Sequence, residues 1–530
     1  MKKKIVLVSF ALVLSLVLFA GCGSSEGNAD PLKAVCNNGV MVGQEENGVV
    51  SFLGVPYAKP PVDELRWKAP VAAEDSDEEI VCDEFGLTPI QYEWATEPAS
   101  YTERGEDCLT LNVWTAKEST EEPKAVMVWF YGGAYSWGGT TDPMYDGQNF
   151  VEANPDIVLV TVNYRLGVMA WADFSQIPGG EEYTDLNLGI RDQICALEWI
   201  QKNIGSFGGN PDNVTIYGES AGAVSTSVLL ISPKAEGLFH KVIVQSDAID
   251  SRVIGTVDDA REYGKLIAET AGAEDMDDLL AVTAEEWIEL DTEYWLGDES
   301  PGTVADGDII PFDYEDAVTA AGKKGIPVMI GSNADERNYD VEELEGYDNF
   351  VEYMNESWDD TYDKVPEAGK KLMDEFMDLQ LEAGKDELFA KVEFLNESSM
   401  RIPEILQSEK FTEGGGTTYM YYWDVPSTSE TYFKGACHAV ELAYVFNNLE
   451  DTIYCGENPD EATAAKAQEA WANFAKTGNP SIEGTEWLPY DKEDRNTMII
   501  TLDGWKMEKD PLSRSREIVS QLITEYGINE

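Results

Sequence analysis

The residues of this 530-residue chain that could do chemistry centre on one serine. Ser220 stands in the pattern Gly-x-Ser-x-Gly, written GESAG, after the β-rich run VTIY and before the small residues AGAV. This order is typical of a strand that turns sharply into a helix and exposes a serine hydroxyl at the turn. Both glycines have a steric reason, because a Cβ on either side would meet the neighbouring strand or helix. The pattern predicts that Ser220 is a nucleophile for acyl transfer.

A serine nucleophile needs a base, and the chain contains two histidines. His240 leads directly into an apolar strand-like run, which favours a structural role. His438 lies far downstream of Ser220, in a loop that opens a predicted helix. Where a triad follows the chain order serine, acid, histidine, the histidine comes last, so we predict His438 as the base.

The acid that orients the base should follow a strand between the serine and the histidine. The run 327–331 is the best candidate strand, and Ser-Asn-Ala-Asp-Glu follows it. Asp335 and Glu336 are both possible acids, and spacing alone does not choose between them.

An oxyanion formed during acyl transfer needs backbone N–H donors. Ala221, directly after the nucleophile, provides one. The segment Tyr-Gly-Gly-Ala at 131–134 follows a strong apolar strand and could provide others, because its glycines let the backbone approach a substrate oxygen closely.

The elements that must position these groups alternate between strands and helices, which predicts an α/β fold with a mostly parallel central sheet and helices on both faces. An amphipathic helix is expected over 192–204, with Asp192 as its cap. Two acid-rich helical blocks, 258–293 and 341–400, are expected to cap the active edge of the sheet. The expected strands are 109–114, 125–131, 157–164, 214–217, 242–245, 327–331 and 417–423.

The N-terminus has the features of a lipoprotein signal peptide. Three lysines precede an apolar run over 5–20, and Ala-Gly-Cys then resembles a bacterial lipobox ending at Cys22. We therefore expect a signal peptide over 1–21, a flexible tether over 22–33 and one catalytic domain over 34–530. The mature protein is expected to be held outside the cytoplasm by a lipid on Cys22. Plain secretion, with Cys22 incidental, is the alternative.

The formal net charge of −63 argues against nucleic acid or an anionic membrane surface as a partner, since both would repel the protein. Without a Cys-x-x-Cys pair and with only two histidines, we expect no metal site, and the predicted chemistry needs no cofactor. The expected partner is a small-molecule ester, and the expected state is a monomer or a weak homo-oligomer.

Four longer motifs carry a resemblance to a known family: FLGVPYAKPPVDELRWKAP, EDCLTLNVW, WFYGGAYSWGG and FGGNPDNVTIYGESAG. Over nearly all of the chain after the tether, the sequence resembles the type-B carboxylesterases, a cholinesterase-like family of α/β-hydrolases. The resemblance implies a serine esterase in which Glu336 is the acid and His438 the base. It implies Gly133, Ala134 and Ala221 as the oxyanion donors. A catalytically inactive, cholinesterase-like adhesion or binding protein is the alternative, although such proteins usually lack the serine or the histidine.

The resemblance also implies a disulfide between Cys82 and Cys108, closing a loop that carries Tyr92, Trp94 and Tyr101. A bridge of this kind would contribute about 3 kcal/mol to stability. Whether Cys437 and Cys455 form a second bridge or remain free thiols stays open.

The chain departs from the family pattern near the expected site. Ala134 and Asp247 replace glycines of that pattern, and Arg337 stands where glycine usually follows the acid. None of these changes removes a member of the predicted triad.

Overall fold

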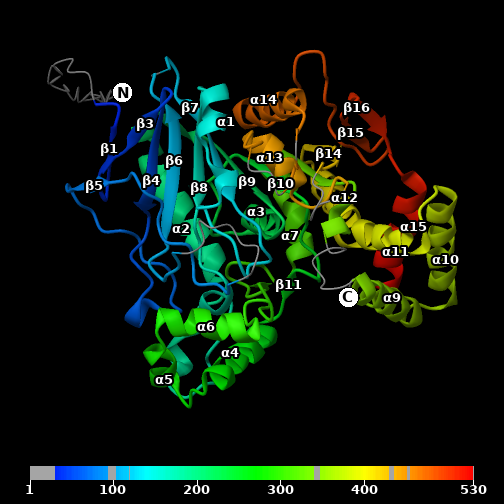
Figure 1. The fold of residues 1–530 in the computed structure, drawn as a ribbon, viewed down its shortest axis with the longest axis horizontal. Helices are drawn as coiled ribbons and strands as arrows, with labels where there is room; N and C mark the ends of the chain where they lie inside the picture. The colour runs from blue at the N-terminus through cyan, green and yellow to red at the C-terminus, as the bar shows by residue number, and fades with distance from the viewer. Residues whose placement is uncertain are drawn as a thin grey trace, which may run out of the picture.

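The computed structural model describes residues 30–93, 103–118, 120–339, 347–428, 435–450, 454–456 and 458–528. Within them, an eleven-stranded sheet has the order β16-β15-β14-β13-β10-β9-β7-β8-β6-β4-β3 (Figure 1). Its strands are β3 (Gln44–Glu46), β4 (Val49–Pro56), β6 (Thr110–Ala116), β7 (Lys124–Phe130), β8 (Ile157–Val162), β9 (Gly209–Glu219), β10 (Lys241–Gln245), β13 (Val328–Asn333), β14 (Thr418–Asp424), β15 (Asn496–Thr501) and β16 (Gly504–Lys509).

The sheet is mixed, with a parallel centre. All neighbours from β8 through β7, β9, β10, β13 and β14 to β15 run parallel, and the outer strands are antiparallel. Strands β7, β8 and β10 are buried along their whole length, which explains their unbroken apolar runs. The predicted α/β fold and its seven expected strands are confirmed. Because Gln245 pairs with both Glu219 and Gly331, the ends of β9, β10 and β13 meet at one edge.

Helices cover both faces of the sheet (Figure 1). On one face, α3 packs against β9 and β10 and contacts α2 and α7. On the other, α13 and α14 pack together, and the Phe446 ring lies 5.2 Å from that of Trp129 on β7. The helices around the sheet are α1 (Gln148–Ala153), α2 (Leu188–Asn203), α3 (Ala221–Ile231), α7 (Tyr314–Ala321), α12 (Ile402–Glu413), α13 (Val440–Phe446), α14 (Glu461–Thr477) and α15 (Ser513–Tyr526).

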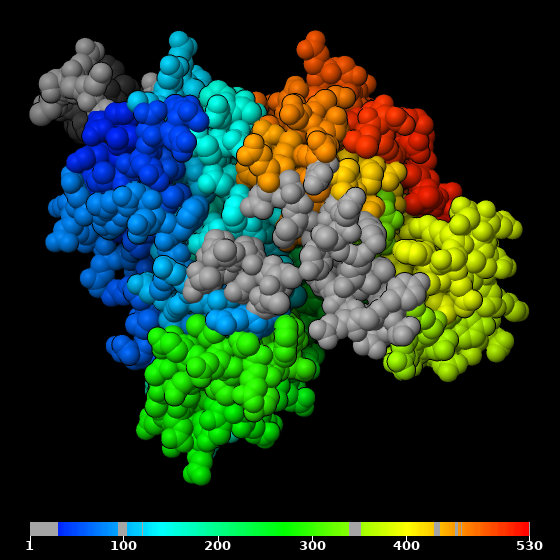
Figure 2. Space-filling view, in the orientation of Figure 1, coloured from blue at the N-terminus to red at the C-terminus, as the bar shows by residue number. Residues whose placement is uncertain are grey.

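The two acid-rich blocks are helical, as expected. The first contains α4 (Val257–Ala271), α5 (Met276–Ala281) and α6 (Ala284–Tyr294), and the second α9 (Tyr347–Lys364), α10 (Glu367–Glu382) and α11 (Glu387–Asn396). They project from the body as separate lobes, the first green and the second yellow in Figure 2, and α10 packs against α15. No helix among the described residues combines the length and the apolar character needed to cross a membrane.

The remaining strands form two small sheets. One joins β1 (Lys33–Cys36), β2 (Gly39–Val42) and β5 (Glu79–Val81) near the N-terminus, and the other joins β11 (Ile254–Gly255) and β12 (Thr303–Val304).

Asp192 does not cap a helix, contrary to expectation. Helix α2 begins four residues earlier, at Leu188, so Asp192 lies in its interior. Its carboxylate accepts hydrogen bonds from Nε and Nη2 of Arg165 at 2.8 and 2.7 Å, and both side chains are buried. A buried guanidinium requires a charged partner, and this requirement explains the aspartate better than a cap does.

Asp192→Asn should lower the free energy of unfolding by about 3–5 kcal/mol, because it leaves the charge of Arg165 buried without a counter-ion. The measurement is urea denaturation followed by tryptophan fluorescence. Glu198→Gln on the exposed side of α2 makes the same chemical change and should shift the midpoint little. Equal losses in the two variants would contradict the assigned importance of the buried pair.

Candidate active site

Ser220 occupies a strained turn between β9 and α3. Its backbone has φ 57° and ψ −125°, a region that costs a non-glycine residue about 1–3 kcal/mol. A Cβ added at Gly218 would lie 2.4 Å from the Gly222 carbonyl oxygen, and one added at Gly222 would lie 2.0 Å from that of Phe130. The predicted steric reason for both glycines is therefore present in the structure.

The segment 132–135 lies against this turn. A Cβ added at Gly132 would lie 3.0 Å from the Ser220 Cβ, and one at Gly133 would lie 2.2 Å from the Trp137 carbonyl oxygen. Gly133, Ala134 and Tyr135 all have positive φ values (98°, 52° and 63°).

The three expected donors have a favourable arrangement. Among the described residues, the N–H groups of Gly133, Ala134 and Ala221 donate to no other group. Ala221 begins α3, where N–H groups lack acceptors within the helix. These groups are available to a substrate oxygen.

His438 lies between two carboxylates. Its Nδ1 atom is 2.6 Å from Glu336 Oε2, and its Nε2 atom is 2.9 Å from Oε1 of Glu219, the residue before the nucleophile. Its backbone N–H donates to the Glu336 carbonyl oxygen at 3.1 Å. His240 is elsewhere: its Nδ1 accepts the backbone N–H of Val214 at 3.2 Å.

Asp335 and Glu336 have different surroundings. Glu336 is buried, and its second oxygen accepts the Asn333 N–H at 2.7 Å. The Asp335 carboxylate instead accepts a hydrogen bond from the N–H of Ala436 at 3.0 Å, and the backbone N–H of Asp335 donates to the Ala436 carbonyl at 2.9 Å. The structure thus places Glu336 against the imidazole, and Asp335 ties down the loop that carries it.

The sequence reasoning missed a network of three buried side chains behind these groups. Glu441 on α13, three residues after His438, accepts hydrogen bonds from Gln245 Nε2 at 3.0 Å and Asn333 Nδ2 at 2.6 Å. The Gln245 carbonyl in turn accepts the Ser220 N–H at 2.9 Å. The network therefore joins the elements carrying the serine, the acid and the histidine. Its sequence signal was a lone glutamate within the apolar run AVELAYVF.

Burial and charge act in opposite directions on His438. Burial alone would lower the pKa of the imidazole, but the carboxylates of Glu219 and Glu336 outweigh it, and the pKa is raised well above its usual range. Burial, followed by the charge of Glu219, raises the pKa of Glu441 to about 7. The site therefore favours the imidazolium form of His438.

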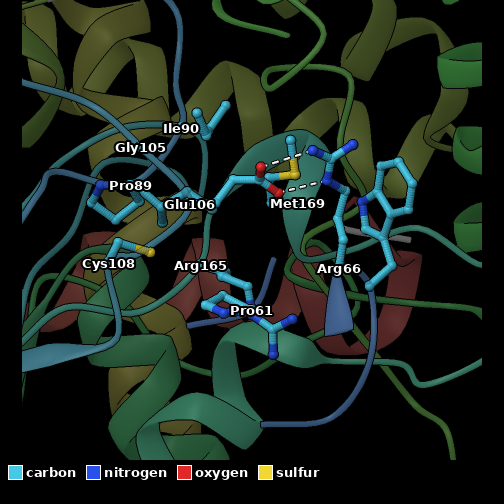
Figure 3. Close-up of a pocket in the computed structure, with 11 residues that line it drawn as sticks. Pro61, Arg66, Pro89, Ile90, Gly105, Glu106, Cys108, Arg165 and Met169 are labelled. Carbon is cyan, nitrogen blue, oxygen red and sulfur yellow. Dashed lines mark hydrogen bonds and ion pairs between the residues drawn. The ribbon is translucent and has the colours of Figure 1, made fainter. Parts of the chain in front are cut away.

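The Cys82–Cys108 disulfide implied by the resemblance is not present, because both residues are free, buried thiols. Cys82 directly follows β5, and its Sγ lies 3.8 Å from the sulfur of Met41 on β2. Cys108 lines a small pocket together with Ile90, and Cys82 is not among its lining residues (Figure 3). Burial raises the pKa of Cys82 to about 11, which keeps it protonated.

An ion pair stabilises the wall of this pocket. Arg66 donates from Nε and Nη2 to the two oxygens of Glu106 at 2.6 and 2.8 Å (Figure 3). Cys437 and Cys455 form no disulfide with each other, which answers the question that the sequence left open.

Some expected residues lie outside the described part of the chain. These are Trp94, Tyr101 and the proposed lipid attachment site Cys22. Tyr92 is described: its ring centroid is 4.7 Å from that of Trp295, and its hydroxyl donates to Asp298 Oδ1 at 3.3 Å. In the described residues, no group of three or more histidine, cysteine, aspartate or glutamate side chains could hold a metal ion.

A serine at a strained strand-to-helix turn, at the edge of a mostly parallel sheet, defines this protein as an α/β-hydrolase. The model of the carboxylesterase family matches residues 33–518, and the chain belongs to that family.

The relatives are esterases. The chain is 33% identical to the para-nitrobenzyl esterase of Bacillus subtilis over 501 residues, covering 90% of this chain and 96% of the relative. It is 31% identical to carboxylesterase 1C of Rattus norvegicus over 476 residues, or 84% of each chain.

Two solved structures agree with this assignment. The Geobacillus stearothermophilus carboxylesterase EST55 at pH 6.2 superposes with a TM-score of 0.80 at 29% identity, covering 92% of this chain and 99% of the other. A thermophilic PNB esterase gives a TM-score of 0.78 at 28% identity, covering 92% and 100%. The protein is a carboxylic ester hydrolase.

The raised pKa of His438 generates a prediction about pH. If neutral His438 is the base, kcat/KM should fall as the pH drops through a value above the usual 6.5, because protonation removes the base. Glu219→Gln should move this acidic limb to lower pH, since it removes one carboxylate that stabilises the imidazolium. The measurement is kcat/KM against pH for p-nitrophenyl acetate.

Glu262→Gln on the exposed side of α4 removes one charge far from the imidazole and is the matched control. An acidic limb that stays in place in Glu219→Gln would contradict the assigned electrostatic coupling.

Proposed function

We propose that the protein hydrolyses carboxylic esters through an acyl-enzyme on Ser220. The Ser220 oxygen attacks the ester carbonyl carbon while His438 Nε2 takes its proton. The tetrahedral intermediate then collapses, the C–O bond to the alcohol breaks, and the imidazolium returns the proton to the departing alcohol. Water, deprotonated by the same imidazole, attacks the acyl carbon, releases the acid and restores the serine.

The other groups act on charge and orientation. Glu336 holds the imidazole by Nδ1 and stabilises its protonated form. The N–H groups of Gly133, Ala134 and Ala221 bind the developing oxyanion. This proposal needs no cofactor.

The observation that carries the proposal is the 2.6 Å contact between His438 Nδ1 and Glu336 Oε2, beside the turn that presents Ser220. Both carboxylates that contact the imidazole are buried, so its orientation is restricted. Esterase relatives over most of the chain support the same reaction class. A binding protein that lacks catalysis would have no need of this arrangement.

We also propose that the protein is lipid-anchored outside the cytoplasm. The support is the sequence around Cys22: a basic start, an apolar run and the small pair Ala-Gly directly before the cysteine. The net charge of −63 would not favour contact with an anionic membrane surface, so the lipid would provide the attachment.

Ser220→Ala should abolish both ester hydrolysis and labelling by a fluorophosphonate probe, because each requires the same hydroxyl. His438→Ala should lower kcat by about 10³-fold or more. His240→Ala is the matched control, since this half-buried histidine lies away from the site, and it should retain most activity. Substantial turnover by folded Ser220→Ala would reject the proposal. A folded wild type that hydrolyses no ester and takes up no probe would instead favour the catalytically inactive alternative.

Cys22→Ala, expressed in a bacterium that processes lipoproteins, should lose metabolic labelling by a fatty acid and leave the membrane fraction. Cys36→Ala, a buried thiol near the same terminus, controls for labelling at other cysteines. Persistent labelling of Cys22→Ala would show that the lipid is not on this residue.

A further inference from the structure

Asp247 lies at the edge of the sheet that carries the catalytic groups. Strand β10 ends at Gln245, whose carbonyl accepts the N–H of Ser220 at 2.9 Å. On the other side, the N–H of Ser246 donates to the carbonyl of Gly331 at 3.0 Å. Asp247 therefore follows a strand that lies between the strand of the nucleophile and the strand of the acid.

The charge of Asp247 is incompletely compensated. The side chain is buried, and its Oδ1 accepts the N–H of the adjacent Ala248 at 2.7 Å. Its cationic neighbour is Arg252, whose Nη2 is 3.6 Å away and whose Nε donates to Asp250 at 2.8 Å. Among the described residues, Oδ2 of Asp247 has no hydrogen-bond partner.

A second buried carboxylate interacts electrostatically with Asp247. Glu404 on α12 is buried, and its Oε1 has no hydrogen-bond partner among the described residues. Asp247 interacts electrostatically with both Glu404 and His438. Burial raises the pKa of Asp247 to about 7, against the opposing charge of Arg252. A cation brought by a substrate would relieve this imbalance.

The Asp247 side chain brings an acceptor for charge-assisted hydrogen bonds to the loop directly after Ser246. Two residues earlier, the Gln245 carbonyl accepts the N–H of the nucleophile Ser220, so this acceptor closely follows a residue that contacts the nucleophile.

We propose that Asp247 is a specificity-determining residue that binds a protonated amino group on the ester substrate. The inference rests on the proposed role of Ser220, since it assigns Asp247 a place beside that nucleophile. The substrate class is therefore esters with an ammonium group a few bonds from the carbonyl, on either the acyl or the alcohol part.

The test uses matched pairs of esters at pH 8.5, followed by titration of the released acid. In the first pair, one ester carries an ammonium group on the acyl chain, and the neutral ester carries a methyl group at the same position. In the second pair, the ammonium and methyl groups are on the alcohol part instead. The wild type should favour the cationic member of at least one pair by kcat/KM. In Asp247→Asn this cationic-to-neutral ratio should fall roughly tenfold, because a charged hydrogen bond is lost.

Asp250→Asn is the matched control. This substitution removes one negative charge from the same loop and frees the same Arg252. Because Asp250 lies outside the sheet edge, the cationic-to-neutral ratio of kcat/KM should stay near that of the wild type. Asp247→Gly provides a second variant that removes the whole side chain, and its ratio should fall as in Asp247→Asn.

The inference is overturned if neither pair shows a cationic preference, if both Asp247 variants keep the wild-type ratio, or if Asp250→Asn lowers it equally. The last result would assign the preference to the overall charge. Failure of the proposed function is distinguishable, because then the wild type would hydrolyse the neutral esters no faster than Ser220→Ala.

Discussion

The close approach of the Phe130 carbonyl to Gly222 is the contact on which the site depends. It brings the end of β7 against the first turn of α3, with room for no side chain between them. Because the segment 132–135 continues directly from β7, its N–H groups arrive beside Ser220 through this contact. The strained conformation of Ser220 persists because β9, β10 and α3 restrain it from three sides.

A second constraint is electrostatic. Burying several carboxylates around one imidazole is expensive unless hydrogen bonds and a counter-charge compensate. Here His438 supplies the charge to Glu219 and Glu336, and the amides of Gln245 and Asn333 satisfy Glu441. The same amides connect β10, whose Gln245 carbonyl accepts the Ser220 N–H, and the strand of the acid to the helix after His438. Charge compensation and positioning of the catalytic groups are therefore performed by the same side chains.

The cysteines show where a resemblance between sequences stops being informative. The motif EDCLTLNVW identifies the position of Cys108, but a disulfide also requires a second cysteine within reach. In the structure, Cys108 lines a pocket together with Ile90, whereas Cys82 lies against Met41. The adjoining wall is held by the bidentate pair of Arg66 and Glu106, which needs no oxidation to form.

Local patterns determined most of the fold and the principal groups of the site. Apolar runs identified the central strands, and the glycines around Ser220 identified the turn. Because the chain has only two histidines, His438 was identified as the base. All three inferences depend on residues that are close in sequence or few in number. Spacing left Asp335 and Glu336 open, and the resemblance to the family pointed to Glu336. Tertiary structure places Glu336 against the imidazole, and it alone put Asp192 against Arg165 and assembled Gln245, Asn333 and Glu441. These outcomes depend on distances between segments far apart in the chain, and spacing along the sequence does not encode such distances.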